Sequence, residues 1–480
     1  MGVQRAGGST GRPERGLVSL TPPVAPRLAR FALDRLGYGP RPESIALVLE
    51  RGLERWISDQ LQGRPDARAE ARIRDLPALH YPVAEVVSRN RADPRFEVSF
   101  YREVRTAHFV RAVHADNQLE EVLTDFWMNH FNVYAVESNV RLGLARYEYD
   151  AIRPHVLGSF RDMLGAVANS WAMMYYLDNY LSTARRINEN YARELMELHT
   201  MGVDGGYGQA DVEEVARAFT GWSLDLRAGS FLYRDGSHDQ GAKTVLGQRL
   251  PPNQGKRDGE QVLDILARHP STARFLCFKL ARRFVADAPP AGLVDRCAET
   301  FQRTGGDLGE VMRTLIGSGE FWAEAFGPGK IKTPHEFVVS ALRALGVELG
   351  SARALLEPRG IETLAAMGMP TFEALDPTGW SDAGSDWIPN PGSHLARINF
   401  VLGLLSQSVE GIDVDLRGLL ADADPNDARA VTRAVDRRIF AGLLPPEVAA
   451  ACSRVTASAG LLPAFKAVAL ALASPAFQVR

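Results

Sequence analysis

Several features that usually point to a function are scarce or absent in this chain. Only three cysteines occur among its 480 residues, Cys277, Cys297 and Cys452. Because no two of them form a C-x-x-C pair, the sequence supports neither a disulfide framework nor a thiolate zinc site. Charge of one sign is also lacking, since 55 lysines and arginines stand against 58 acidic residues. A balanced chain has no global attraction for nucleic acid, so we expect no nucleic-acid partner.

Long hydrophobic runs are missing as well. Residues 1–16 are rich in glycine and arginine and contain no apolar core of the kind that a secretory signal needs. The most apolar late stretch, residues 461–477, is interrupted by Pro463, Lys466 and Pro475 and is too short to span a bilayer. These absences predict a cytoplasmic protein without a membrane span.

The common catalytic and nucleotide-binding motifs are not found either. The chain has no G-x-G-x-x-G after a strand and no P-loop, which argues against a dinucleotide-binding or P-loop fold. It has no G-x-S-x-G elbow for a serine nucleophile. The H-E-x-x-H zinc motif and the E-x-x-H di-iron motif are also absent.

Helical periodicity dominates the sequence that is present. A typical case is the stretch 117–131, where a helix places apolar residues on one face, namely Leu119, Val122, Leu123, Phe126 and Trp127. Strand patterns are confined to residues 230–250, while residues 366–392 are rich in Gly, Pro, Asp and Trp. The sequence therefore predicts a mainly α fold, a large multi-helix globular body with one or two small β-hairpins and long ordered loops.

The composition along the chain also suggests its domain organisation. Residues 1–25 have three prolines and no periodicity, so we predict a disordered N-terminal tail. Residues 26–480 are expected to form a single helical domain. Within it we expect two sub-lobes, 26–225 and 260–480, joined by a β and loop segment at 226–259.

The segment NENYARELMELHTMG, residues 188–202, is the most informative for chemistry. At 100° per residue, Asn190, Glu194 and Glu197 share a narrow helix face beside an apolar stripe. Such oxygen ligands can hold a cation, or one carboxylate can act as a general base, with Asn190 and Arg193 binding the substrate. The alternative is a solvated face with ion pairs to arginines.

Two further segments contain a histidine that could take part in a site. His130, in DFWMNHF, continues an apolar stripe and is expected to point inward, either as a ligand or general base or as a hydrogen-bonded core histidine. Residues 237–247 place His238, Asp239 and Lys243 in a glycine-flanked turn. That turn provides metal ligands or an acid–base pair, or else it is an exposed polar turn.

A third candidate is the loop PTGWSDAGSDWIPNPG, residues 377–392. Trp380 and Trp387 lie close in sequence to Asp382 and Asp386. Tryptophan rings beside carboxylates suit carbohydrate binding, and pairs of Asp residues serve in glycoside hydrolysis. The alternative is that the two tryptophans hold a long loop against the body of the protein.

Taken together, these segments resemble the bacterial family catalogued as domain of unknown function 1800. The resemblance rests on FWMNHF, the string at 188–222, HDQGAKTVLG, and the segments 267–285, 332–346 and 379–387. It covers roughly residues 28–478 and implies no settled activity. Family members are commonly encoded beside proteins that resemble alkaline phosphatases and sulfatases, and many members are exported. The family often has an aromatic residue at the position of His199, and no family-wide catalytic residue is transferred.

Two hypotheses about function follow. The first is an enzyme with a pocket for Mn, Fe or Zn and hydrolytic chemistry by metal-activated water. Its expected catalytic residues are His130, Glu194, Glu197 and Lys243. Its expected metal ligands are His130, Glu194, Glu197, His238 and Asp239. The second is a non-catalytic helical scaffold that docks the companion phosphatase- or sulfatase-like protein, and a carbohydrate-binding role for the Trp380/Trp387 loop is also kept open.

Overall fold

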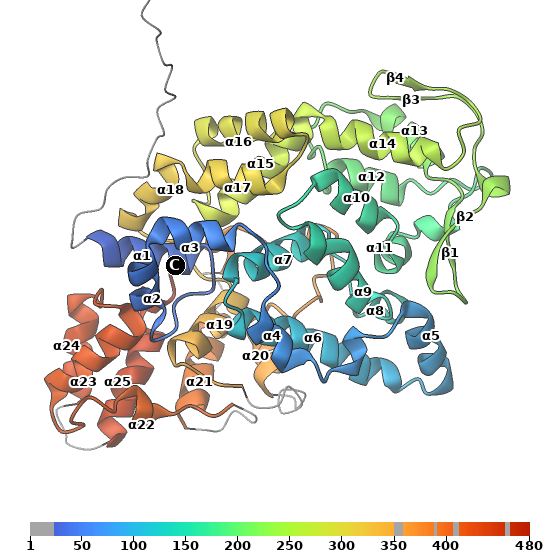
Figure 1. Ribbon diagram of the computed structural model, residues 1–480. Helices are drawn as coiled ribbons and strands as arrows, with labels where there is room; N and C mark the ends of the chain where they lie inside the picture. Colours follow the sequence, from blue (N-terminus) through green and yellow to red (C-terminus); the bar gives the residue numbers. More distant parts are fainter. Residues whose placement is uncertain (1–23, 350–358, 388–390, 407–411, 457–460) are drawn as a thin grey trace, which may run out of the picture.

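The computed structural model describes residues 24–349, 359–387, 391–406, 412–456 and 461–480. Within these residues the chain forms 25 α-helices and two separate two-stranded antiparallel sheets (Figure 1). The predicted mainly α fold is therefore confirmed. Among the helices so described, none combines the length and the apolar character needed to cross a membrane.

The helices follow one another in four consecutive groups. The first is α1 (Val24–Arg35), α2 (Ser44–Arg51), α3 (Leu53–Gln60), α4 (Ala67–Ile73), α5 (Val83–Ala92), α6 (Phe96–His114), α7 (Gln118–His130), α8 (Ser138–Arg141) and α9 (Leu144–Arg146). The second, after a π-helical turn η2 (Tyr147–Ile152), is α10 (Phe160–Ala168), α11 (Trp171–Tyr176), α12 (Asn190–Glu197) and α13 (Gln209–Ala218).

The remaining helices form the second half of the chain. The third group is α14 (Arg257–Arg268), α15 (Pro270–Phe284), α16 (Ala291–Thr304), α17 (Leu308–Ile316), α18 (Gly319–Ala323) and α19 (Pro334–Ala344). The fourth is α20 (Arg359–Ala366), α21 (Pro391–Leu405), α22 (Leu416–Leu419), α23 (Ala428–Val435), α24 (Pro446–Val455) and α25 (Leu461–Ala473).

Three of the four strands lie in the segment 230–250 for which strand patterns were predicted, and β1 lies just before it. Strand β1 (Trp222–Asp225) pairs with β2 (Ser230–Tyr233), and β3 (Lys243–Val245) pairs with β4 (Gln248–Leu250). Leu246 and Gly247 join β3 to β4 with φ angles of 49° and 76°, and two positive φ values are typical of a tight type I′ hairpin turn. The hairpins lie at the opposite end of the molecule from helices α22–α25 (Figure 1).

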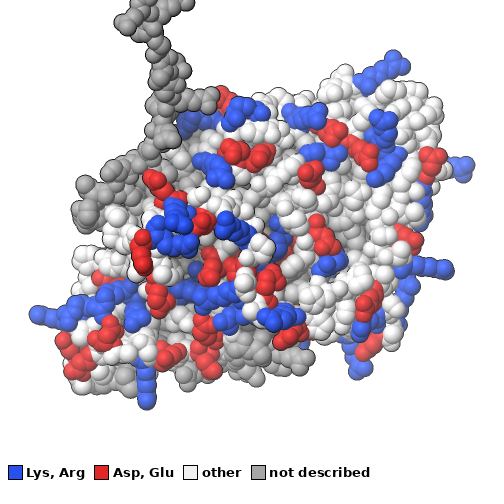
Figure 2. All heavy atoms as spheres, in the orientation of Figure 1, with Lys and Arg blue, Asp and Glu red and all other residues white. Residues whose placement is uncertain are grey.

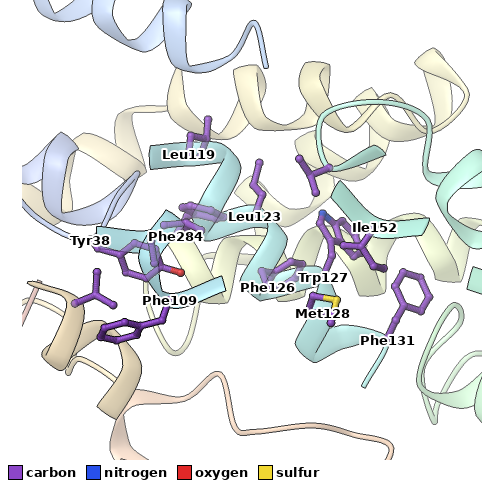
Figure 3. Close-up of a cluster of buried hydrophobic side chains, with 14 of the residues drawn as sticks. Tyr38, Phe109, Leu119, Leu123, Phe126, Trp127, Met128, Phe131, Ile152 and Phe284 are labelled. Carbon is purple, nitrogen blue, oxygen red and sulfur yellow. The ribbon is translucent and has the colours of Figure 1, made fainter. Parts of the chain in front are cut away.

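Helix α7 lies at the centre of the hydrophobic core. The apolar face predicted for this helix is buried, with exposed fractions of at most 2% for Leu119, Val122, Leu123, Phe126 and Trp127. Figure 3 shows Leu119, Leu123, Phe126 and Trp127 packed among residues of neighbouring elements, including Phe109 of α6 and Phe284 of α15. A polar side chain on the buried face of α7 therefore needs a specific partner.

Candidate metal centre

His130 is a core histidine in this structure. Its side chain is 1% exposed and its Nε2 donates a hydrogen bond of 3.1 Å to the backbone carbonyl of His199. Its ring packs against Trp127 and Phe131. Burial, with a smaller contribution from Lys279, lowers the pKa of His130 well below its ordinary value, so the ring is neutral.

The carboxylates of α12 are half-buried and close enough to affect one another. Burial and the charge of Glu197 raise the pKa of Glu194. Arg193 pairs with Glu189 at 3.3 Å, while Asn190 is exposed. The described ion pairs include neither of the two α12 glutamates, so the predicted solvated face is present without the predicted ion pairs to arginine.

The predicted turn at 237–247 directs its side chains toward α14. His238 Nε2 and Lys243 Nζ both contact the same carboxylate oxygen of Asp258, at 3.0 and 2.7 Å, and all three side chains are fully buried. Asp239 instead pairs with Arg217 at 2.9 Å. The structure therefore brings His238 and Lys243 together on one oxygen of a buried carboxylate, while the other oxygen, Asp258 Oδ1, has no hydrogen-bond partner.

The tryptophan loop packs onto the C-terminal end of α7. The side-chain amide of Asn129 accepts a hydrogen bond from the backbone N–H of Trp380 (2.7 Å) and donates one to its carbonyl oxygen (2.8 Å). Gly379 has a φ of 72°, and a Cβ atom there would lie 2.4 Å from the backbone carbonyl oxygen of Asn129. Only glycine permits this approach. The rings of Trp380 and Trp387 lie 6.3 Å apart.

The same loop covers a group of potential metal ligands. His108 of α6, Asp125 of α7 and His335 of α19 each offer one ligand atom, and these three atoms lie within 4.8 Å of one another. Among the residues that the structure describes, no other group of three or more His, Cys, Asp or Glu side chains brings its ligand atoms within this distance of one another.

None of the five ligands predicted from the sequence belongs to this group. The grouping of His130, Glu194, Glu197, His238 and Asp239 into one metal site therefore stays a prediction that their contacts do not support.

His108 lies between two carboxylates. Its Nδ1 donates to Glu148 Oε2 over 3.2 Å, and its Nε2 lies 3.5 Å from Asp125 Oδ1. Glu148, in the π-helical turn η2, is fully buried and also accepts a hydrogen bond of 2.7 Å from Arg153. A carboxylate that holds one ring nitrogen of a histidine fixes the orientation of the ring and directs the other nitrogen outward, as at many metal centres.

The N-terminus of α19 positions His335. The sequence Thr333-Pro334-His335-Glu336 starts this helix with proline in its first turn and a capping box in which the Thr333 hydroxyl accepts from the Glu336 N–H at 3.2 Å. His335 is 3% exposed, and its Nε2 is buried without a hydrogen-bond partner. A buried polar atom of this kind costs free energy unless something binds to it.

The pKa values reflect this crowding of charges. Burial acts to lower the pKa of His108, but Glu148 and Asp125 outweigh it and raise that pKa to about 10. Burial acts to raise the pKa of Asp125, but the neighbouring histidines and an arginine outweigh it, so that pKa falls to about 2. Burial lowers the pKa of His335 to about 4 against the opposing charge of Asp125. His335 is therefore neutral at pH 7 and keeps a lone pair for a ligand, whereas His108 is protonated and has to release the proton on its Nε2 before that atom can bind a metal.

One separation between ligand atoms fits a transition metal. Zinc–nitrogen and zinc–oxygen bonds of about 2.0–2.1 Å in tetrahedral geometry place two ligand atoms about 3.4 Å apart. The distance of 3.5 Å between His108 Nε2 and Asp125 Oδ1 agrees with this value. Two imidazoles and one carboxylate suit Fe, Zn or Mn better than Mg or Ca.

Two small cavities adjoin this group beneath the tryptophan loop. Each has a volume of about 30 Å³, and Asp125, Asn129 and Trp380 line both of them. A volume of this size holds one or two water molecules. Asp125 keeps 23% of its side chain exposed, so the cavities give water access to this carboxylate.

Comparison with known proteins places the chain in a family. The family model described as "Protein of unknown function (DUF1800)" matches residues 31–479, nearly the whole chain. The protein belongs to the DUF1800 family. No curated protein and no solved structure matches it, so the chemistry of this DUF1800 protein has to be inferred from its own residues.

The three candidate ligands of this DUF1800 protein gave only weak signals in the sequence. His108 is part of TAHFVRAVH and reads as a core position of an apolar helix. Asp125 lies between Thr124 and Phe126, one turn before Asn129, and His335 follows a proline at the start of a helix. The sequence does contain one indication of these three ligands, which is an ionisable residue inside an apolar helical stripe. Such a residue is buried and therefore needs a buried partner.

Proposed function

We propose that this DUF1800 protein binds one divalent transition-metal ion, Zn, Fe or Mn, through His108, Asp125 and His335. The observation that carries the proposal is the meeting of three ligand atoms within 4.8 Å, supported by the buried His335 Nε2 that has no hydrogen-bond partner. Glu148 orients the ring of His108, and Asn129 holds the tryptophan loop over the site.

The reaction class that fits this arrangement best is hydrolysis. A bound metal with an open position would activate a water molecule at neutral pH. The small cavities beside Asp125 are large enough for one or two water molecules, Asp125 is the partly exposed member of the group, and Trp380 lines both cavities. Trp380 and Asp382 line one of these cavities and are two of the five substrate-contacting candidates that the sequence suggested.

Metal analysis tests the proposal directly. The protein, purified with a histidine-free tag and equilibrated in turn with Zn, Mn and Fe(II), is dialysed and analysed by plasma mass spectrometry. We expect about one ion per chain in the parent and none in His335→Gln. The matched control His199→Gln changes a buried histidine outside the group and should keep the ion.

Glu148 gives a second and more specific test. Glu148→Gln keeps the size of the side chain but removes the charge that holds His108 Nδ1. Loss of such an outer partner typically lowers metal affinity about 10- to 100-fold, which isothermal titration with Zn measures. If the parent binds no metal under any of these conditions, His108 serves as a buried ion-pair partner and the scaffold hypothesis replaces the enzyme.

Hydrolysis is assayed separately. The metal-loaded parent is incubated with p-nitrophenyl phosphate, sulfate and acetate, and turnover that depends on the metal and is lost in Asp125→Asn supports the reaction class. Metal binding without turnover on any of these esters would overturn hydrolysis of simple esters and leave the metal site standing.

A further inference from the structure

A second feature lies away from the metal group. A cleft of about 900 Å³ opens between α2, α3, the segment 62–68 and the turn between α6 and α7. Figure 2 shows basic and acidic side chains next to one another over α2 and α3. The charged residues that line the cleft are Arg41, Arg51, Arg55, Arg64, Arg68, Arg343, Glu43, Asp59, Asp66 and Asp116.

Most of the acidic groups in the cleft already have partners. Asp59 accepts a hydrogen bond of 2.8 Å from Arg51. Asp66 is buried and accepts hydrogen bonds from three backbone N–H groups. Asp116 Oδ1 lies 3.8 Å from Arg68 Nη1, and the fourth acidic residue, Glu43, is exposed. These carboxylates therefore leave the two deepest arginines without a direct counter-ion.

Those two arginines are Arg41 and Arg343, which share one acceptor. Arg41 Nη2 and Arg343 Nη1 both donate to the backbone carbonyl of Val113, each over 2.7 Å. Arg343 is 4% exposed, and its other bonds go to carbonyl oxygens. Arg41 Nη1 is buried and has no hydrogen-bond partner. Among the described ion pairs, neither guanidinium is joined to a carboxylate.

The neighbouring histidine shows the effect of this positive charge. Burial, followed by the charges of nearby arginines that include Arg41 and Arg343, lowers the pKa of His114 to about 2. His114 is therefore neutral, and its Nε2 accepts a hydrogen bond from the backbone N–H of Leu349 at 3.3 Å. Burial and the charge of Arg68 lower the pKa of Arg41 to about 10.

We propose that this cleft binds a phosphate or sulfate group carried by a larger polar molecule, with the oxyanion held by Arg41 and Arg343. A guanidinium presents planar donors that match the oxygens of such a group, and an anion between the two arginines removes their mutual repulsion. The cleft is far larger than a free ion and falls in the range of small-molecule sites. Trp56 and Ser44 are among the other residues that line it.

Binding is tested with the full-length protein. Thermal unfolding is recorded in sodium phosphate, sodium sulfate and sodium chloride at equal ionic strength. We expect phosphate and sulfate to raise the melting temperature by about 2 °C or more above chloride, because a ligand that binds only the folded state stabilises it. Calorimetric titration then compares inorganic phosphate with glycerol phosphate and glucose 6-sulfate, and tighter binding of an ester identifies the larger molecule as the ligand.

The variant Arg41→Gln locates the site. It removes one of the two charges but leaves Arg343 and its three carbonyl partners in place. We expect the dissociation constant for phosphate to rise about tenfold or more. Arg303→Gln, at an exposed position of α16 outside the cleft, should leave it unchanged.

Two results would overturn the proposal. One is a parent protein whose melting temperature is the same in phosphate, sulfate and chloride. The other is an anion effect that is equal in the parent and in Arg41→Gln, since the anion then binds elsewhere. Neither experiment requires bound metal, so the cleft and the metal site are tested independently.

Discussion

Replacing His199 with phenylalanine should make the folded protein less sensitive to acid. The His199 ring is buried beside Phe131, and both of its nitrogens lack a hydrogen-bond partner. Burial, with a smaller contribution from Lys279, lowers its pKa to about 3. The folded protein therefore keeps this ring neutral at any pH above that value.

The size of the effect follows from proton uptake by the unfolded chain. An unfolded histidine has a pKa of about 6.5, so below that pH the unfolded state binds a proton that the folded state does not. The free energy of unfolding therefore falls as the pH falls. For a folded pKa of about 3, the loss between pH 7 and pH 5 is about 2 kcal/mol from this single histidine.

Urea unfolding at pH 7 and pH 5 measures this difference. We expect the change in unfolding free energy between the two pH values to be smaller by about 2 kcal/mol in His199→Phe than in the parent. His80→Phe, at an exposed histidine, controls for the substitution itself. If His199→Phe and the parent lose the same stability at pH 5, the ring is not neutral in the folded protein and the reasoning is wrong.

Three further outcomes are expected from thermal unfolding at neutral pH. Glu194→Gln with Glu197→Gln should leave the melting temperature unchanged or slightly higher, because the substitutions remove a partly buried charge and its repulsion by Glu197, the two causes that raise the pKa of Glu194; a large drop would reveal an ion-pair network. Gly259→Ala should destabilise by about 1–3 kcal/mol, since its Cβ atom would lie 2.6 Å from the Trp222 ring. Asp258→Asn should cost about 3–5 kcal/mol because it breaks a fully buried ionic group, and an unchanged melting temperature would contradict that assignment.

The parts of the fold that depend on local patterns were predictable from the sequence. The apolar face of α7 follows from a repeat of three and four residues, and both hairpins lie in or beside the segment with alternating apolar positions. The T-x-x-E pattern at Thr333 begins α19 as a capping box does. In each case the residues that decide the structure are neighbours in the chain.

The candidate site depends on contacts that local patterns do not contain. His108 and His335 meet through the packing of α6 on α19, and nothing close to either histidine in the sequence indicates the other. His238 was predicted to lie in a polar turn, but its partner Asp258 belongs to helix α14, 20 residues further along the chain, and contacts its Nε2. The periodicity placed His130 inward correctly, yet periodicity alone does not distinguish a ligand from a core histidine.

The three candidate ligands come from parts of the chain that are synthesised at different times. Helices α6 and α7 leave the ribosome long before α19 and the loop at Gly379. Contacts between distant segments form late because closing the intervening chain costs entropy. A nascent chain that ends before residue 334 contains His108, Asp125 and Glu148 but lacks the third ligand and the covering loop. If the proposed metal site forms, it forms only after the second half of the chain has folded onto the first.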